Sequence, residues 1–197
     1  MAPRDMQPEL TLLSRLRQGD EEAFAQLYRR HKDAVYRFAL LWSGSAATAS
    51  DATQEAFLLL MSKPAQYDPV RGSLAAWLCG IARNFVRREA GLREDPTDPG
   101  DFAEAAGFVA AACPETRLLA SETADAVRRA LAAVAPHYRD VLVLCELTDL
   151  SYAEAAHVCG IDIGTVRSRL SRGRAQLADR MARLGLLDDA PRAKEAS

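Results

Sequence analysis

A group of arginine, serine and threonine residues near the C-terminus has the chemistry needed to bind DNA. Residues 163–184 contain six arginines and one aspartate, which gives this stretch a local charge of +5. Small polar side chains and arginines at the start of a helix can read base edges in the major groove and bind phosphates. An ordinary solvated basic face is the alternative interpretation. The candidate residues are Thr165, Arg167, Ser168, Arg169, Ser171, Arg172 and Arg174.

The residues around this group predict a helix-turn-helix. Ser151 and Glu154 have the spacing of a capping box, in which each side chain satisfies a free backbone N–H at the start of a helix. Gly160 suits the left-handed backbone that ends such a helix, and Asp162 can cap the next one. Because these signals occur together with one-sided arginines, the sequence favours DNA binding over a solvated basic face.

A second basic group lies in the middle of the chain. Ser73 predicts the start of a helix that extends to Glu89, and the preceding segment 63–73 is predicted to be a loop marked by proline and glycine. Such a helix and loop could hold a phosphate backbone and unstacked bases. These residues alone are equally typical of a basic surface cluster. The candidates are Tyr67, Arg71, Arg83, Asn84, Arg87 and Arg88.

The overall pattern predicts an all-α protein with two small helical domains. We expect the first at residues 10–90 and the second at residues 122–187. The segment 91–121 contains prolines and glycine and more acidic than basic residues, so it is predicted to be a flexible acidic linker. In the first domain, Asp51, Gln54 and Glu55 project polar groups from one predicted helix, which by itself is typical of a solvated surface.

Composition and spacing exclude several classes of protein. The formal net charge is −2, so any surface that binds nucleic acid must be local. No apolar run is long enough to cross a membrane and no secretory signal is present, which predicts a cytoplasmic protein. The four cysteines are far apart and the three histidines lack ligand spacing, so we expect buried reduced thiols, no metal and no cofactor.

Three segments in order resemble one family. DATQEAFLLL (51–60), RGSLAAWLCGIARNFVRRE (71–89) and LTDLSYAEAAHVCGIDIGTVRSRLSRGRAQL (147–177) resemble the bacterial RNA polymerase sigma factors of the extracytoplasmic-function (ECF) type. This compact branch of the sigma-70 family keeps only regions 2 and 4. The resemblance covers about residues 20–90 and 122–184, which is most of the chain.

The resemblance implies a role for each group. Asp51, Gln54 and Glu55 correspond to the helix that docks on the beta-prime clamp helices of core RNA polymerase, while the beta subunit is a further expected partner. The loop from Tyr67 and the helix with Arg83 correspond to the part that opens and reads the -10 element of promoter DNA. The helix-turn-helix corresponds to the reader of the -35 element. The linker corresponds to a segment that extends towards the active-site channel, and an anti-sigma factor is the usual regulator.

Three functions therefore compete. The first is a dissociable polymerase subunit that directs promoter-specific transcription initiation. The second is a stand-alone helix-turn-helix regulator, but such a protein would usually dimerise, and no dimer helix is evident. The third is an enzyme, and neither a carboxylate–histidine cluster nor a glycine-rich phosphate loop is present to support it.

Overall fold

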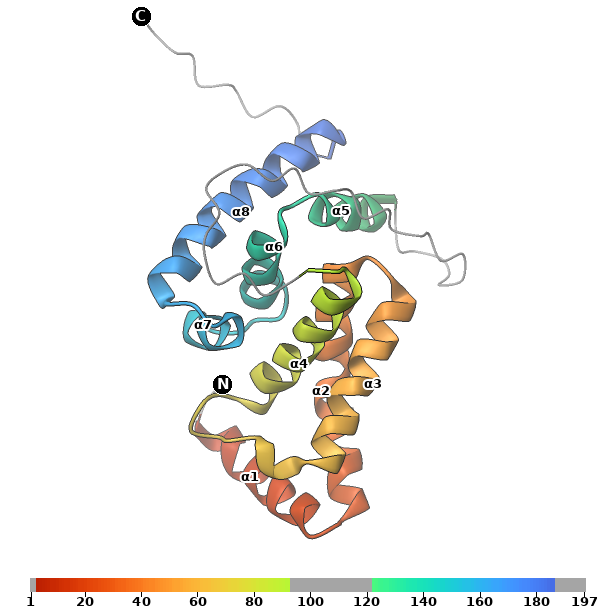
Figure 1. Ribbon diagram of the computed structural model, residues 1–197, viewed down its shortest axis with the longest axis vertical. Coiled ribbons are helices and arrows are strands. Elements are labelled where there is room, and N and C mark those ends of the chain that lie inside the picture. The colour runs from red at the N-terminus through yellow and green to blue at the C-terminus, as the bar shows by residue number, and fades with distance from the viewer. Residues whose placement is uncertain (1–2, 93–121, 187–197) are drawn as a thin grey trace, which may run out of the picture.

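The structure is a computed structural model that describes residues 3–92 and 122–186. Throughout these two ranges the regular elements are helices, so the all-α prediction is confirmed. The residues predicted to form the linker lie almost entirely outside the described ranges. Figure 1 shows the two groups of helices, α1–α4 and α5–α8, which we call the first and second domains.

The first domain has three long helices that pack against one another. They are α2 (Glu21–Ser43), α3 (Ala46–Ser62) and α4 (Leu74–Glu89) (Figure 1). The helix α1 (Pro3–Arg17) packs against α2 and against the short 3₁₀ helix η1 (Pro64–Gln66).

Local sequence signals explain where these helices begin and end. The Asp20 carboxylate accepts hydrogen bonds from the backbone N–H groups of Glu22 and Ala23, at 3.0 and 3.1 Å, and so caps α2. Gly44 ends α2 with a left-handed φ of 69°, and Ser73 caps α4 through the N–H of Ala76.

The second domain contains the predicted helix-turn-helix. Its elements are α5 (Glu122–Ala132), α6 (Pro136–Leu142), a π-helical turn η2 (Val143–Leu147), α7 (Tyr152–Cys159) and α8 (Ile163–Arg183). Ser151 and Glu154 form both halves of the capping box at the start of α7. Gly160 has a φ of 68°, and Asp162 caps α8 through the N–H of Thr165 at 2.8 Å. The predicted helix-turn-helix is therefore present.

Close packing of α8 on α6 fixes the orientation of the second helix of this motif. Val166 and Leu170 are buried on the inner side of α8. At Gly173, a Cβ atom would lie only 3.0 Å from Cγ and Cδ1 of Leu142. The absence of a side chain therefore lets the two helices approach closely, while the opposite side of α8 remains exposed.

The two domains also contact each other. The helix α4 packs against α7, and α2 packs against α5 and η2. Because α4 carries four of the candidate DNA-binding residues, this contact determines which of those four are exposed.

Candidate nucleic-acid interface

The start of α8 presents an exposed polar and basic surface. Arg167, Ser168 and Ser171 are exposed, whereas Thr165 is half-buried and its hydroxyl donates to Asp162 at 2.6 Å. Arg172 is exposed and lies 3.5 Å from the Tyr138 hydroxyl. These side chains come from one helix whose inner side is fixed by packing, so their positions are well defined for contact with a DNA groove.

Two other candidates on α8 have different surroundings. Arg174 is exposed and forms an ion pair with Glu146 of η2. Arg169 is only 6% exposed, and its buried Nε atom has no hydrogen-bond partner within the described residues. In this arrangement Arg169 faces the interior, so the exposed surface of α8 consists of the remaining candidates.

The four candidates on α4 are divided between two sides of the helix. Asn84 and Arg88 are exposed, and the Arg88 guanidinium lies 5.2 Å from the Phe85 ring centroid. Arg83 and Arg87 are buried, with 7% and 9% of their surface exposed. In this arrangement only one side of the helix is accessible to DNA.

A single carboxylate of the second domain binds both buried arginines. Oδ2 of Asp140 in α6 accepts hydrogen bonds from Arg83 Nε at 2.9 Å and from Arg87 Nη1 at 3.0 Å. Oδ1 of the same residue accepts a hydrogen bond from Trp42 Nε1 at 2.7 Å. Asp140 is 1% exposed, so the cluster is a buried ionic contact between the domains.

Arg139, the neighbour of Asp140, adds a second set of contacts. Its Nη1 donates to the backbone oxygen of Trp42 at 2.9 Å, and its guanidinium lies 5.0 Å from the centroid of that indole ring. Burial lowers the pKa of Arg139 to about 10, although the adjacent Asp140 carboxylate opposes the shift. Sequence reasoning missed this pair. A charged dipeptide placed directly before the apolar run Val141–Leu144 was the available signal.

The loop before α4 is held by the buried Tyr67. Its hydroxyl donates to the Gly72 carbonyl at 2.9 Å, and its ring lies 5.8 Å from that of Trp77. Burial, with smaller contributions from nearby carboxylates, raises the pKa of Tyr67 to about 12. Tyr67 is 4% exposed and therefore positions the loop, whereas Arg71 is exposed at its tip.

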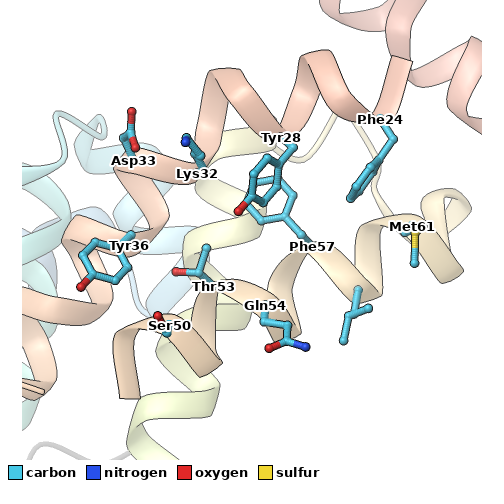
Figure 2. Close-up of a pocket in the computed structure, with 11 residues that line it drawn as sticks. Phe24, Tyr28, Lys32, Asp33, Tyr36, Ser50, Thr53, Gln54, Phe57 and Met61 are labelled. Atoms are coloured by element: carbon cyan, nitrogen blue, oxygen red, sulfur yellow. The ribbon is translucent and has the colours of Figure 1, made fainter. Parts of the chain in front are cut away.

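The polar group on α3 borders an open groove. Asp51, Gln54 and Glu55 are all exposed. Gln54 lines a groove of about 580 Å³ between α2 and α3, whose walls include Tyr28 and Phe57 (Figure 2).

Apolar side chains continue this surface along α3. Leu58 and Met61 are 45% and 50% exposed, and both line the same groove. They follow Gln54 by four and seven positions, which places all three on one side of the helix. Sequence reasoning missed this groove, although the spacing of these residues could have indicated it. An exposed apolar surface bordered by polar residues is typical of a protein-binding site.

The described residues contain no group of three or more histidine, cysteine or acidic side chains that could hold a metal ion. None of the described helices is both long enough and apolar enough to cross a membrane.

Two family models match the chain. The model described as sigma-70 region 2 matches residues 27–91, and the model described as sigma-70, region 4 matches residues 124–177. The first match covers α3, α4 and most of α2, and the second covers the helix-turn-helix together with the helices before it.

Named relatives agree with these matches. The chain is 35% identical over 175 residues to the ECF RNA polymerase sigma factor SigE of Mycolicibacterium smegmatis, and the match covers 84% of this chain and 65% of that protein, just under two thirds. It is 34% identical over 163 residues to the ECF sigma factor SigM of Mycobacterium tuberculosis strain H37Rv, covering 81% of this chain and 78% of the relative.

Solved structures share the fold at lower identity. CnrH, in complex with the cytosolic domain of CnrY, has a TM-score of 0.66 and 24% identity, with 88% of this chain and 96% of that chain covered. The sigma factor RpoE of Bartonella quintana, in complex with the anti-sigma factor NepR, has a TM-score of 0.58 and 24% identity, covering 81% and 96%. Taken with the family models and the relatives, this shows that the chain belongs to the sigma-70 family as a sigma factor of the ECF type, a transcription initiation factor and not an enzyme.

Proposed function

We propose that this sigma factor binds core RNA polymerase and promoter DNA through separate surfaces of its two domains. The proposed boundaries are residues 10–90 for region 2, 91–121 for the linker and 122–187 for region 4. Region 4 reads the -35 element through the exposed side of α8. The observation that carries this proposal is the exposed group of Arg167, Ser168, Ser171 and Arg172 on α8, a helix that Asp162 caps and that follows the capping box of α7 and the turn at Gly160.

Region 2 supplies the contact with polymerase and with the -10 element. The beta-prime clamp helices bind beside the groove between α2 and α3, where they contact Asp51, Gln54 and Glu55. The beta subunit is a further partner of the chain. The exposed apolar residues Leu58 and Met61 support a protein partner at this surface. A stand-alone regulator would not need such a site.

The -10 element is bound by the loop that contains Arg71 and by α4. Asn84 and Arg88 are accessible as the protein stands, and Arg83 and Arg87 join them when the two domains separate. Tyr67 keeps the loop in place through its hydrogen bond to Gly72. We place this activity in the cytoplasm, where core polymerase acts.

A separate anti-sigma factor is proposed as the regulator. The structural relatives CnrH and RpoE were solved with the cytosolic domain of CnrY and with the anti-sigma factor NepR, respectively. A partner of this kind would cover both domains of this chain at once. A pull-down from the native cell, under stressed and unstressed growth, should recover such a protein; recovery of polymerase subunits alone would contradict this part of the proposal.

Promoter binding by reconstituted holoenzyme tests the assignment of α8. We expect Arg167→Ala to weaken binding to the cognate promoter by about 1–3 kcal/mol if it contacts a base. Arg180→Ala is the matched control, because Arg180 is an exposed arginine of the same helix, more than three turns from Arg167 and about two turns beyond Arg172, the last residue of the proposed contact surface. Equal affinities for the two variants and the wild type would show that the DNA-binding side of α8 is misassigned.

A further inference from the structure

The carboxylate of Asp140 bridges the two domains. Its three hydrogen-bond donors, Trp42, Arg83 and Arg87, all come from the first domain, whereas Asp140 itself lies in α6 of the second. All four side chains are at least nine-tenths buried. Charge-assisted hydrogen bonds between arginine and a carboxylate are stronger than neutral ones, so this contact is specific for the charge of Asp140.

A second polar contact closes the same interface at the beginning of α4. The Ser73 hydroxyl donates a hydrogen bond to the Glu154 carboxylate in α7. Between these two polar contacts the helices approach closely, because a Cβ atom on Gly80 would lie 3.8 Å from Cγ1 of Val158. The helix α4 therefore contacts the second domain through α7, at Ser73 and Gly80, as well as through Asp140 of α6.

The arginines bound by Asp140 have the chemistry that DNA would also use. A guanidinium binds phosphate oxygens and carboxylate oxygens with the same donor geometry. Arg83 and Arg87 are less than 10% exposed, so they cannot reach a DNA strand while the domains are in contact. Binding of Asp140 and binding of DNA are thus mutually exclusive for these two side chains.

We propose that Asp140 is an autoinhibitory latch that closes the two domains on each other in the free chain and occupies the arginines needed for promoter DNA. The proposal rests on the function assigned above to Arg83 and Arg87. Polymerase opens the latch by binding each domain at its own site. The free chain consequently binds DNA weakly, even though each domain carries a basic surface.

The strength of such a latch need only be moderate. A buried ion pair gains little over the separated, hydrated charges, because desolvation offsets the Coulomb attraction. Removing the Asp140 carboxylate, by contrast, leaves the two arginines buried without a counter-charge, and this favours separation of the two domains. If the open form is about one tenth of the free chain, opening it fully increases the apparent affinity for DNA roughly tenfold.

Asp140→Asn in the full-length chain tests the latch with two readouts. The first is the radius of gyration from small-angle X-ray scattering of the free protein. The second is fluorescence anisotropy with a fluorescein-labelled fork-junction DNA at one fixed salt concentration. Asp179→Asn is the matched control, because it removes one carboxylate from the same domain at an exposed position. Trp42→Phe is a second variant, which keeps an aromatic ring but removes the Nε1 donor.

We expect Asp140→Asn to increase the radius of gyration and to tighten fork-junction binding roughly tenfold, with Trp42→Phe intermediate and Asp179→Asn unchanged. Far-UV circular dichroism verifies that each variant is folded. An unchanged radius for both Asp140→Asn and Trp42→Phe would overturn the latch, while promoter-specific transcription by the wild-type holoenzyme would still support the proposed function. A larger radius without tighter binding would overturn the inhibitory role and also the assignment of Arg83 and Arg87 to DNA.

Discussion

The indole Nε1 of Trp42 donates a 2.7 Å hydrogen bond to Oδ1 of Asp140, although the two residues are 98 positions apart in the chain. Trp42 lies in the last turn of α2, and Asp140 lies in the middle of α6. Both are at most 2% exposed. The contact thus joins the end of a core helix in one domain to the helix that supports α8 in the other.

Trp42 should report whether the domains are in contact. Its indole ring is 2% exposed, so acrylamide should quench its fluorescence weakly in the free protein. Trp77→Phe is needed as the background, because Trp77 is partly exposed and would add its own signal. In this background we expect Asp140→Asn to increase the quenching constant of Trp42 several-fold, because it removes the carboxylate that holds the domains together. Strong quenching before this substitution is made would contradict the closed arrangement.

Gly173 should be intolerant of a side chain. Replacing glycine with alanine inside a helix usually stabilises it by about 1 kcal/mol. Here the new Cβ would lie 3.0 Å from Leu142 atoms and 3.3 Å from Tyr138 Cβ, and both neighbours are buried. Overpacking of this kind costs about 1–3 kcal/mol, so we expect Gly173→Ala to be destabilising on balance.

Thermal unfolding followed by circular dichroism measures the effect at Gly173. Gly173→Val should lower the melting temperature further than Gly173→Ala, because it adds more atoms to the same contact. Ser171→Ala is the control at an exposed position of the same helix and should change the melting temperature little. A higher melting temperature for Gly173→Ala would mean that α6 and α8 can move apart without cost.

The positions of the helices could be predicted because the signals for them are local. Asp20, Ser73 and Ser151 each accept a hydrogen bond from a backbone N–H two or three residues later, so a short stretch of sequence is enough to identify the cap. Gly44 and Gly160 end their helices for an equally local reason, the left-handed backbone that glycine adopts without strain.

Burial of the arginines could not be predicted in the same way. The sequence predicts that Arg83, Asn84, Arg87 and Arg88 lie together on the side of α4 opposite its apolar residues. It contains no local signal that a second domain covers Arg83 and Arg87 but leaves Asn84 and Arg88 exposed. The burial of the two arginines depends on Asp140, which lies more than fifty positions after them in the chain. The sequence pattern of α4 alone does not reveal this contact.

The three cysteines within the described residues should be unreactive in the folded protein. Burial raises the pKa of Cys79 and of Cys159 to about 12, and that of Cys145 to about 11. Since the thiolate is the nucleophile, almost none of the reactive form exists at pH 8. In a Cys113→Ser variant we expect Ellman's reagent to label fewer than one thiol within minutes, and three after unfolding in guanidinium. Labelling at the rate of a free thiol before unfolding would contradict this.

Glu154 should make the stability of the protein depend on pH in the acidic range. Burial of this carboxyl alone would raise its pKa, but hydrogen bonds from the Ser73 and Ser151 hydroxyls and from backbone N–H groups outweigh that effect and lower it. A folded-state pKa below the unfolded value of about 4.3 contributes stability that is fully present above that value. The contribution is lost as the pH falls through the folded pKa, because the protonated carboxyl is a poorer acceptor.

Glu154→Gln removes this titration and keeps a side chain of similar shape. We expect the variant to be less stable than the wild type at pH 7, where the carboxylate accepts from Ser151 Oγ at 2.7 Å and from Ser151 N at 3.0 Å. As the pH falls below about 4.3 the difference should begin to shrink, because the carboxyl then binds protons more readily in the unfolded state than in the folded state. Melting temperatures at half-unit pH intervals measure both effects, with the exposed Glu55→Gln as control. A difference that stays constant down to pH 3 would show that the capping carboxylate does not titrate in this interval and that shape alone explains the loss.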